Sequence, residues 1–67
     1  MAEAFTARDK AECADREVKQ RRRVYPRLVS EGRMTQQLAD RQTALMEAIA
    51  TDYRMVADAE EAKGRLF

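Results

Sequence analysis

The sequence predicts an all-α protein: a two-helix antiparallel hairpin with coiled-coil-like packing, which dimerises into a four-helix bundle. Ala, Arg and Glu, all strong helix formers, are the most frequent residues, whereas Ile occurs only once. Apolar residues recur at spacings of three and four along two long segments. Between these segments stands a short stretch that holds the only proline and one of the two glycines. Residues 1–67 are therefore expected to fold as one hairpin.

A chain of 67 residues forms at most one domain, and its core alone gives marginal stability. An internal disulfide is excluded because Cys13 is the only cysteine. The chain has no histidine, and a lone thiol cannot build a tetrahedral metal site. We therefore expect no metal and no cofactor. The remaining source of stability is a partner chain, and a homodimer is favoured over other oligomers.

The first helix is predicted over about residues 4–31. The a and d positions of a heptad hold small and apolar residues with Arg21 as the one polar exception: Ala4, Ala7, Ala11, Ala14, Val18, Arg21, Tyr25 and Leu28. Alanines let a neighbouring backbone approach closely. Thr6 and Asp9 have the spacing of a capping box, although the pattern already begins at Ala4. Acidic and basic residues four apart would add local support, at Glu12–Arg16, Asp15–Lys19 and Glu17–Arg21.

The junction between the helices is predicted from its proline and glycine. Pro26 lacks a backbone donor and disfavours helical angles at the preceding residue, so we expect a kink near Pro26. Leu28 stays in phase with the heptad, which indicates one further turn. Gly32 suits the left-handed position just past a helix end. The turn is therefore assigned to residues 32–35, and Thr35 is a good N-cap for a second helix over about residues 36–64.

The second helix carries a wide apolar face. Its main stripe is Leu38, Leu45, Ile49 and Val56, and its flanks are Ala39, Met46, Ala50, Tyr53 and Ala57. Such a face needs more than one neighbour, whereas a hairpin offers one, which again favours a dimer with this helix near the bundle centre. The predicted oligomer interface is Leu38, Leu45, Met46, Ile49, Tyr53 and Val56. A strict heptad would place Asp52 at a buried d position. A 3.6-residue repeat places Tyr53 at that position instead and is therefore preferred.

Basic residues concentrate near the turn, although the net charge of the whole chain is only +1. A hairpin would bring Arg22, Arg23, Arg27 and Arg33 to its tip, where they could contact nucleic acid or another acidic partner. The alternative is a solvated face whose arginines pair with neighbouring acids, since consecutive helical residues point in different directions. Arg21 also has two interpretations. In the first, its guanidinium pairs with an acid of another chain. In the second, its aliphatic part packs against the neighbouring helix while its guanidinium reaches water.

Other motifs carry less information. Residues 34–41 are similar to the opening helix of a helix-turn-helix domain, but the helical pattern continues where that motif needs a turn. Cys13 falls at an outward heptad position with nothing to activate its thiol. The methionines are expected to fill the core. No catalytic motif occurs, and we do not expect an enzyme.

No apolar run approaches the roughly 20 residues of a membrane span, and no signal peptide is visible. With a single free thiol, the expected location is a reducing cytoplasm.

The stretches 25–29, 32–35 and 52–54 (YPRLV, GRMT and DYR) resemble short, uncharacterised helical proteins of proteobacterial genomes and prophages. The resemblance implies a bacterial or phage setting and assigns no site residues. The leading hypothesis is a small adaptor that oligomerises and binds another macromolecule, with an unknown protein as its partner. The alternatives are a nucleic-acid-associated protein with a basic hairpin tip, and a chain whose second helix docks into the groove of a larger partner.

Overall fold

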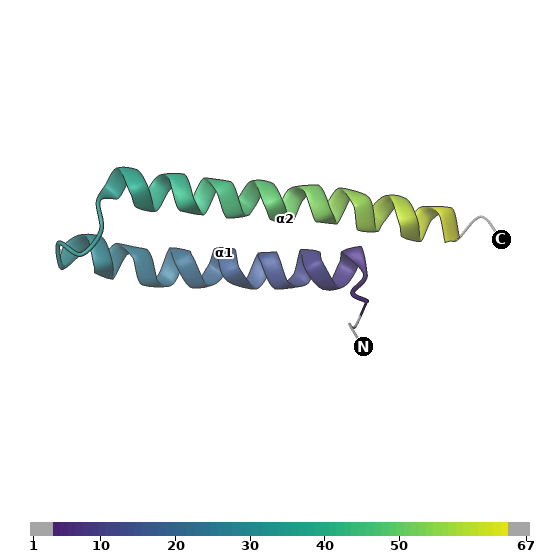
Figure 1. Cartoon of the computed structure of the whole chain (residues 1–67), viewed down its shortest axis with the longest axis horizontal. Coiled ribbons are helices and arrows are strands. Elements are labelled where there is room, and N and C mark those ends of the chain that lie inside the picture. The colour runs from purple at the N-terminus through teal and green to yellow at the C-terminus, as the bar shows by residue number, and fades with distance from the viewer. Residues whose placement is uncertain (1–3, 65–67) are drawn as a thin grey trace.

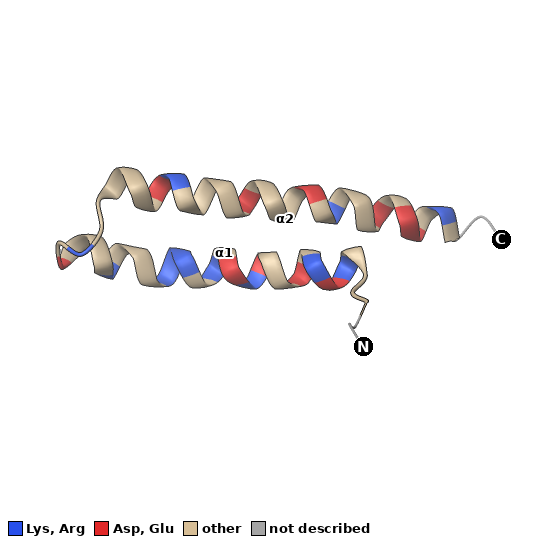
Figure 2. Ribbon diagram, viewed as in Figure 1, with Lys and Arg blue, Asp and Glu red and all other residues tan. Residues whose placement is uncertain are grey.

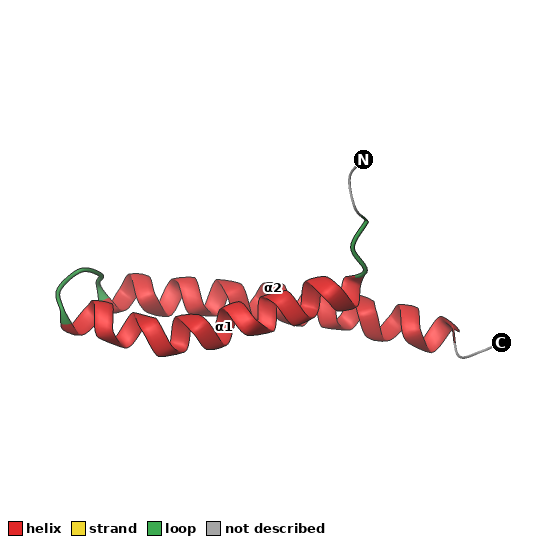
Figure 3. Ribbon diagram, turned by 90° about the horizontal axis from the view of Figure 1, so that it is seen from below, coloured by secondary structure: helices red, strands yellow, loops and turns green. Residues whose placement is uncertain are grey.

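The computed structural model describes residues 4–64, which form two helices joined by one short turn. Helix α1 spans Ala7–Ser30 and helix α2 spans Gln36–Gly64. The helices run antiparallel and side by side in both views of the chain (Figures 1 and 3). The described residues contain no strand. The prediction of an all-α helical hairpin is confirmed.

A capping box fixes the start of α1. The Thr6 hydroxyl accepts a hydrogen bond from the Asp9 N–H at 3.0 Å, and the Asp9 carboxylate accepts one from the Thr6 N–H at 3.2 Å. Thr6 itself has extended backbone angles, so the helix cannot include it. The predicted start near residue 4 is therefore three residues too early. Ala4 lies exposed before the helix rather than on its packed side.

The end of α1 has the hydrogen bonds of a Schellman motif. The helix continues through Pro26 for one further turn, as expected. Arg33 N–H then donates to Leu28 O at 2.9 Å, and Gly32 N–H donates to Val29 O at 3.0 Å. Gly32 has a φ of 74°, the left-handed conformation that was predicted for it. These bonds satisfy carbonyls at the helix end and reverse the chain.

Helix α2 begins directly after Thr35, whose hydroxyl accepts a hydrogen bond from the Leu38 N–H at 3.1 Å. The predicted N-cap is confirmed, and the bounds of α2 match the predicted 36–64. The end of α2 extends past the first turn of α1 (Figure 1). No helix of the described part of the chain is long and apolar enough to cross a membrane.

The interface between α1 and α2 is built from small side chains. Its buried residues are five alanines and one valine: Ala11, Ala14, Val18, Ala39, Ala50 and Ala57. The three from α1 lie on the predicted heptad seam. Met46 and Ile49 are partly buried against the cluster of Ala14, Val18 and Ala50. Small residues on both sides allow close approach but supply little apolar area. The core of a single hairpin is therefore shallow.

Candidate functional site

Charged residues occur along both helices (Figure 2). Arginine–carboxylate contacts join the two helices along one side of the hairpin. We call these contacts the interhelix ladder. Its residues among those described are Arg8, Asp15 and Arg22 of α1 and Glu47, Arg54, Asp58 and Glu61 of α2. The sequence interpretation missed the ladder, because the pairs lie 25 to 53 residues apart.

The ladder follows the heptad of both helices. Arg8 donates to Glu61 at 2.8 Å and to Asp58 at 2.7 Å, and Arg54 donates to Asp15 at 2.6 Å. Each step of seven residues forward in α1 is a step of seven residues back in α2. The ladder therefore specifies one register of the hairpin along its length.

Arg8 contacts two carboxylates of the ladder, Asp58 and Glu61. The hydrogen bond to Glu61, followed by the one to Asp58, raises the pKa of the Arg8 guanidinium above its usual value. Arg8 consequently keeps its charge at every pH at which the chain is studied. The two carboxylates that it contacts lie in the last turns of α2, so Arg8 anchors the part of α2 that extends past α1.

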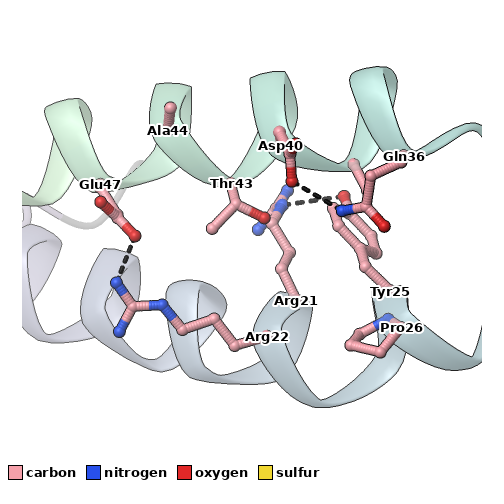
Figure 4. Close-up of a pocket in the computed structure, with 10 residues that line it drawn as sticks. Arg21, Arg22, Tyr25, Pro26, Gln36, Asp40, Thr43, Ala44 and Glu47 are labelled. Atoms are coloured by element: carbon pink, nitrogen blue, oxygen red, sulfur yellow. Dashed lines mark hydrogen bonds and ion pairs between the residues drawn. The ribbon is translucent and has the colours of Figure 1, made fainter.

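The guanidinium of Arg21 contacts residues of its own helix, α1. The guanidinium donates to Glu17 Oε2 at 3.0 Å. It also donates to the Tyr25 hydroxyl at 3.1 Å, as Figure 4 shows. The expected Glu17–Arg21 pair is thus present. Asp15, in contrast, pairs with Arg54 across the hairpin rather than with Lys19. Local spacing predicted the first pair and could not anticipate that a neighbouring helix offers Asp15 a partner.

Figure 4 shows a cleft between the two helices near the turn. Arg22 of α1 donates to Glu47 of α2 across it, and Gln36 donates to Asp40 at 2.8 Å within α2. Both carboxylates that line the cleft are therefore hydrogen-bonded to neighbouring side chains. No group of three or more His, Cys, Asp or Glu residues within 4–64 is placed to hold a metal ion.

The arginines predicted at the hairpin tip do not form one cluster. Arg22 belongs to the interhelix ladder, Arg23 donates to Gln20, and Arg33 lies 3.8 Å from Glu31. The fourth, Arg27, is exposed and makes no side-chain contact of this kind with the described residues. The turn-proximal positive charge is therefore divided between several directions.

A basic stripe does form on the outer side of α1, away from α2. Its residues recur at helical spacing and are all exposed: Arg16, Lys19, Arg23 and Arg27. The sequence interpretation weighed Lys19 together with Arg22, Arg23 and Arg27, but it chose residues near the turn and did not consider Arg16. Spacings of three, four and four would have identified the stripe, since such residues share one side of a helix.

Several large apolar side chains of α2 are not covered by α1. Leu38 is 45% exposed, Leu45 51% and Val56 46%, whereas the alanines on the flank of this stripe face α1. We call this surface the open face, which comprises Leu38, Leu45, Tyr53 and Val56 together with Ile49 at its edge, where Ile49 is also partly buried against α1. All five belong to the predicted oligomer interface. The sixth residue predicted there, Met46, is half-buried and contributes to packing against α1.

A shallow groove runs beside the open face, between the two helices. It is lined by Cys13 and Ala14 of α1 and by Met46 and Ile49 of α2, among others. Lys10 Nζ lies 5.4 Å from the centroid of the Tyr53 ring, a cation–π geometry that ties the edge of the open face to α1. Cys13 is a free, exposed thiol in this groove, consistent with its predicted outward position.

Asp52 and Tyr53 are both exposed within the hairpin. No carboxylate of residues 4–64 is buried, and the strict heptad that would have placed Asp52 in the hairpin core is not used.

No protein-family model matches this chain, and no curated protein and no solved structure matches it either. The function is therefore argued from the chain's own residues.

Proposed function

We propose that this protein is a small, non-enzymatic helical interaction protein, which assembles with a second copy of itself and binds another macromolecule in that form. The observation that carries the proposal is the placement of apolar side chains in α2. Its alanines face α1, while Leu38, Leu45 and Val56 are left near half exposure. A second chain on the open face would bury the residues with the most apolar area.

The energetic argument concerns side-chain size. Full burial of a Leu, Ile or Val side chain contributes roughly 1.5–3 kcal/mol, whereas an alanine contributes much less. The hairpin buries five alanines and one valine, and no large side chain in the described residues is fully buried. A chain of 67 residues with such a core needs additional burial to be stable. Self-association supplies it without a disulfide or a metal.

The test is the solution mass by light scattering over a range of protein concentrations, with far-UV circular dichroism alongside. We expect a helical dimer that persists at high salt, because apolar burial is not screened by ions. The variant Leu38→Gln/Leu45→Gln should dissociate the dimer and lower its helicity at low concentration. Met55→Gln is the matched control, since Met55 is 65% exposed and lies off the open face. A wild-type monomer at all concentrations would refute the proposal.

A second candidate function, nucleic-acid association, is favoured by the basic stripe on α1. Its four cations are exposed on one side, and no acidic residue lies on that side between Arg16 and Ser30. Such a stripe can follow a phosphate backbone, and the binding would weaken steeply with salt. The hairpin tip is a weaker candidate for this binding than the basic stripe, because Arg22 and Arg33 have acidic neighbours.

Fluorescence anisotropy with a labelled DNA duplex at 50–200 mM salt tests this candidate. Arg23→Gln/Arg27→Gln should reduce binding several-fold and lower the salt dependence, because each lost phosphate contact removes one released counterion. Arg22→Gln is the control, since its guanidinium is already engaged by Glu47. Equal losses in both variants, or no binding by the wild type, would reject the candidate.

The cellular setting remains a prediction from the sequence. We propose a cytoplasmic location on the basis of the single free thiol. The bacterial or prophage setting rests on the resemblance described above.

A further inference from the structure

We propose that α2 pairs with α2 of a second copy in the antiparallel direction, in a register centred on residue 47. In this register Leu38 meets the partner's Val56, and Leu45 meets the partner's Ile49. The inference rests on the proposed function, because it specifies the geometry of the self-association. It adds the orientation, the register and the residues that select them.

Four of the five residues of the open face are placed symmetrically about residue 47, and the fifth, Tyr53, falls opposite the partner's Arg41. Leu45 and Ile49 lie two residues on either side of it, and Leu38 and Val56 lie nine residues on either side. In an antiparallel pair, residue numbers rise along one helix as they fall along the other. Both apolar matches therefore form at once, and each forms twice because the pair has two-fold symmetry.

Polar residues beside the open face follow the same symmetry. Gln42 and Asp52 lie five residues on either side of residue 47, and Arg41 is next to Gln42. Asp52 thus meets the partner's Gln42 and lies beside the partner's Arg41. Its carboxylate accepts hydrogen bonds from the amide and from the guanidinium. Asp52, which lies beside the open face, therefore meets complementary groups of the second copy.

Arg41 and Asp52 have no side-chain partner among residues 4–64. Both are exposed, and neither makes an ion pair or a side-chain hydrogen bond with a described residue. Elsewhere on α2, the charges of Glu47, Arg54 and Asp58 are engaged by α1. The hairpin therefore satisfies the charges on its ladder side and leaves an oppositely charged pair on the side that faces the second copy.

Other arrangements of the same two helices are less favourable. In a parallel pair Asp52 lies against the partner's Asp52, and Arg41 against the partner's Arg41, so that like charges meet. A slide of seven residues toward the carboxyl ends brings Asp52 against the partner's Ile49, which leaves a carboxylate on an apolar side chain. A polar layer within an apolar seam selects orientation and register in this way.

Charge reversal tests the orientation with the full-length chain. Arg41→Glu and Asp52→Arg should each raise the dimer dissociation constant by about tenfold, since two contacts are lost per dimer. The double variant should restore the wild-type value. Within one chain the two residues are about 16 Å apart, beyond the screening length of about 8 Å at physiological salt, so the rescue reports contact between chains. Arg16→Glu on the outer side of α1 is the matched control and should leave the constant unchanged.

Disulfide cross-linking tests the register independently, in a background with Cys13→Ser. Residues 38 and 56 of one chain are about 27 Å apart, whereas a disulfide needs Cα atoms within about 7 Å. A mixture of Leu38→Cys and Val56→Cys chains should therefore cross-link, and neither variant should cross-link alone. The solution mass of each variant is measured by light scattering before oxidation.

The outcomes separate this inference from the proposed function. A dimer in which Leu38→Cys cross-links to itself, or in which the double charge reversal is no better than the single ones, would overturn the antiparallel register and leave self-association intact. A monomer at every concentration, with no cross-link in the mixture, would overturn both. A cross-link confined to the mixture, together with rescue by the double variant, would establish the register.

Discussion

Arg54 of α2 donates a hydrogen bond to Asp15 of α1 at 2.6 Å, across the side of the hairpin that carries the interhelix ladder. The same heptad step leads from this pair to Arg22–Glu47 near the turn and to Arg8–Glu61 near the open end. These contacts occupy one side of the hairpin. The opposite side of α2 carries the leucines of the open face. The hairpin is thus two-sided, with the charges of the interhelix ladder paired on one side and the exposed apolar residues of the open face available to a second chain on the other.

The Asp15–Arg54 pair should show a measurable coupling energy. In a double-mutant cycle with Asp15→Asn and Arg54→Gln, we expect a coupling of about 0.2–1 kcal/mol in the free energy of unfolding, since both side chains are partly exposed. The coupling should decrease at high salt because ions screen it. Urea unfolding at one protein concentration measures it. A coupling that is zero at low salt would contradict the ladder.

Ala50 should not tolerate a larger side chain. It is 2% exposed at the contact of α1 and α2, so Ala50→Leu forces the helices apart and should lower the free energy of unfolding by about 1–3 kcal/mol. Ala44→Leu is the control, because Ala44 is exposed on the same helix, and its effect should stay within about 0.5 kcal/mol. Thermal unfolding by circular dichroism measures both. Equal effects would mean that the alanine contact is not close-packed.

Gly32 should be required for its backbone angle alone. Its φ is 74°, and no atom lies within 4 Å of the position that a Cβ would take. Gly32→Ala should therefore cost about 1–2 kcal/mol through the left-handed conformation rather than through a clash. Gly64→Ala is the matched control, since Gly64 also has open space but a helical conformation, and it should be neutral or stabilising. A harmless Gly32→Ala would show that the turn adopts another geometry.

Pro26 should lower the stability of α1. The helix is continuous through Pro26, which leaves the carbonyl of Arg22 without its usual donor. Pro26→Ala restores that hydrogen bond and should raise the free energy of unfolding by about 1–3 kcal/mol. Part of this gain is offset because the unfolded chain has more conformational freedom without the proline. Lys19→Ala, an exposed position in the same helix, should change it little. A destabilised Pro26→Ala variant would indicate that the proline sets the direction of the last turn.

The sequence alone predicted the elements and their ends with few errors. Thr6, Gly32 and Thr35 each satisfy backbone groups within five residues along the chain, so the start of α1, the turn and the start of α2 are local properties. The three-residue error at the start of α1 came from giving more weight to the alanine repeat than to the capping box. The all-α class and the α1 seam followed from periodicity, because helical spacing places such residues on one side.

The tertiary structure decided how α2 is rotated about its axis. Two apolar lines run along this helix, one of alanines and one of larger residues, and periodicity gave no reason for either to face α1. Ala39, Ala50 and Ala57 face it because small side chains let the two backbones approach, and this rotation also brings the arginines and carboxylates of the two helices together. Such contacts join residues 25 or more positions apart, so only the packed hairpin determines them. The same rotation leaves Leu38, Leu45 and Val56 exposed, which is the basis of the proposed self-association.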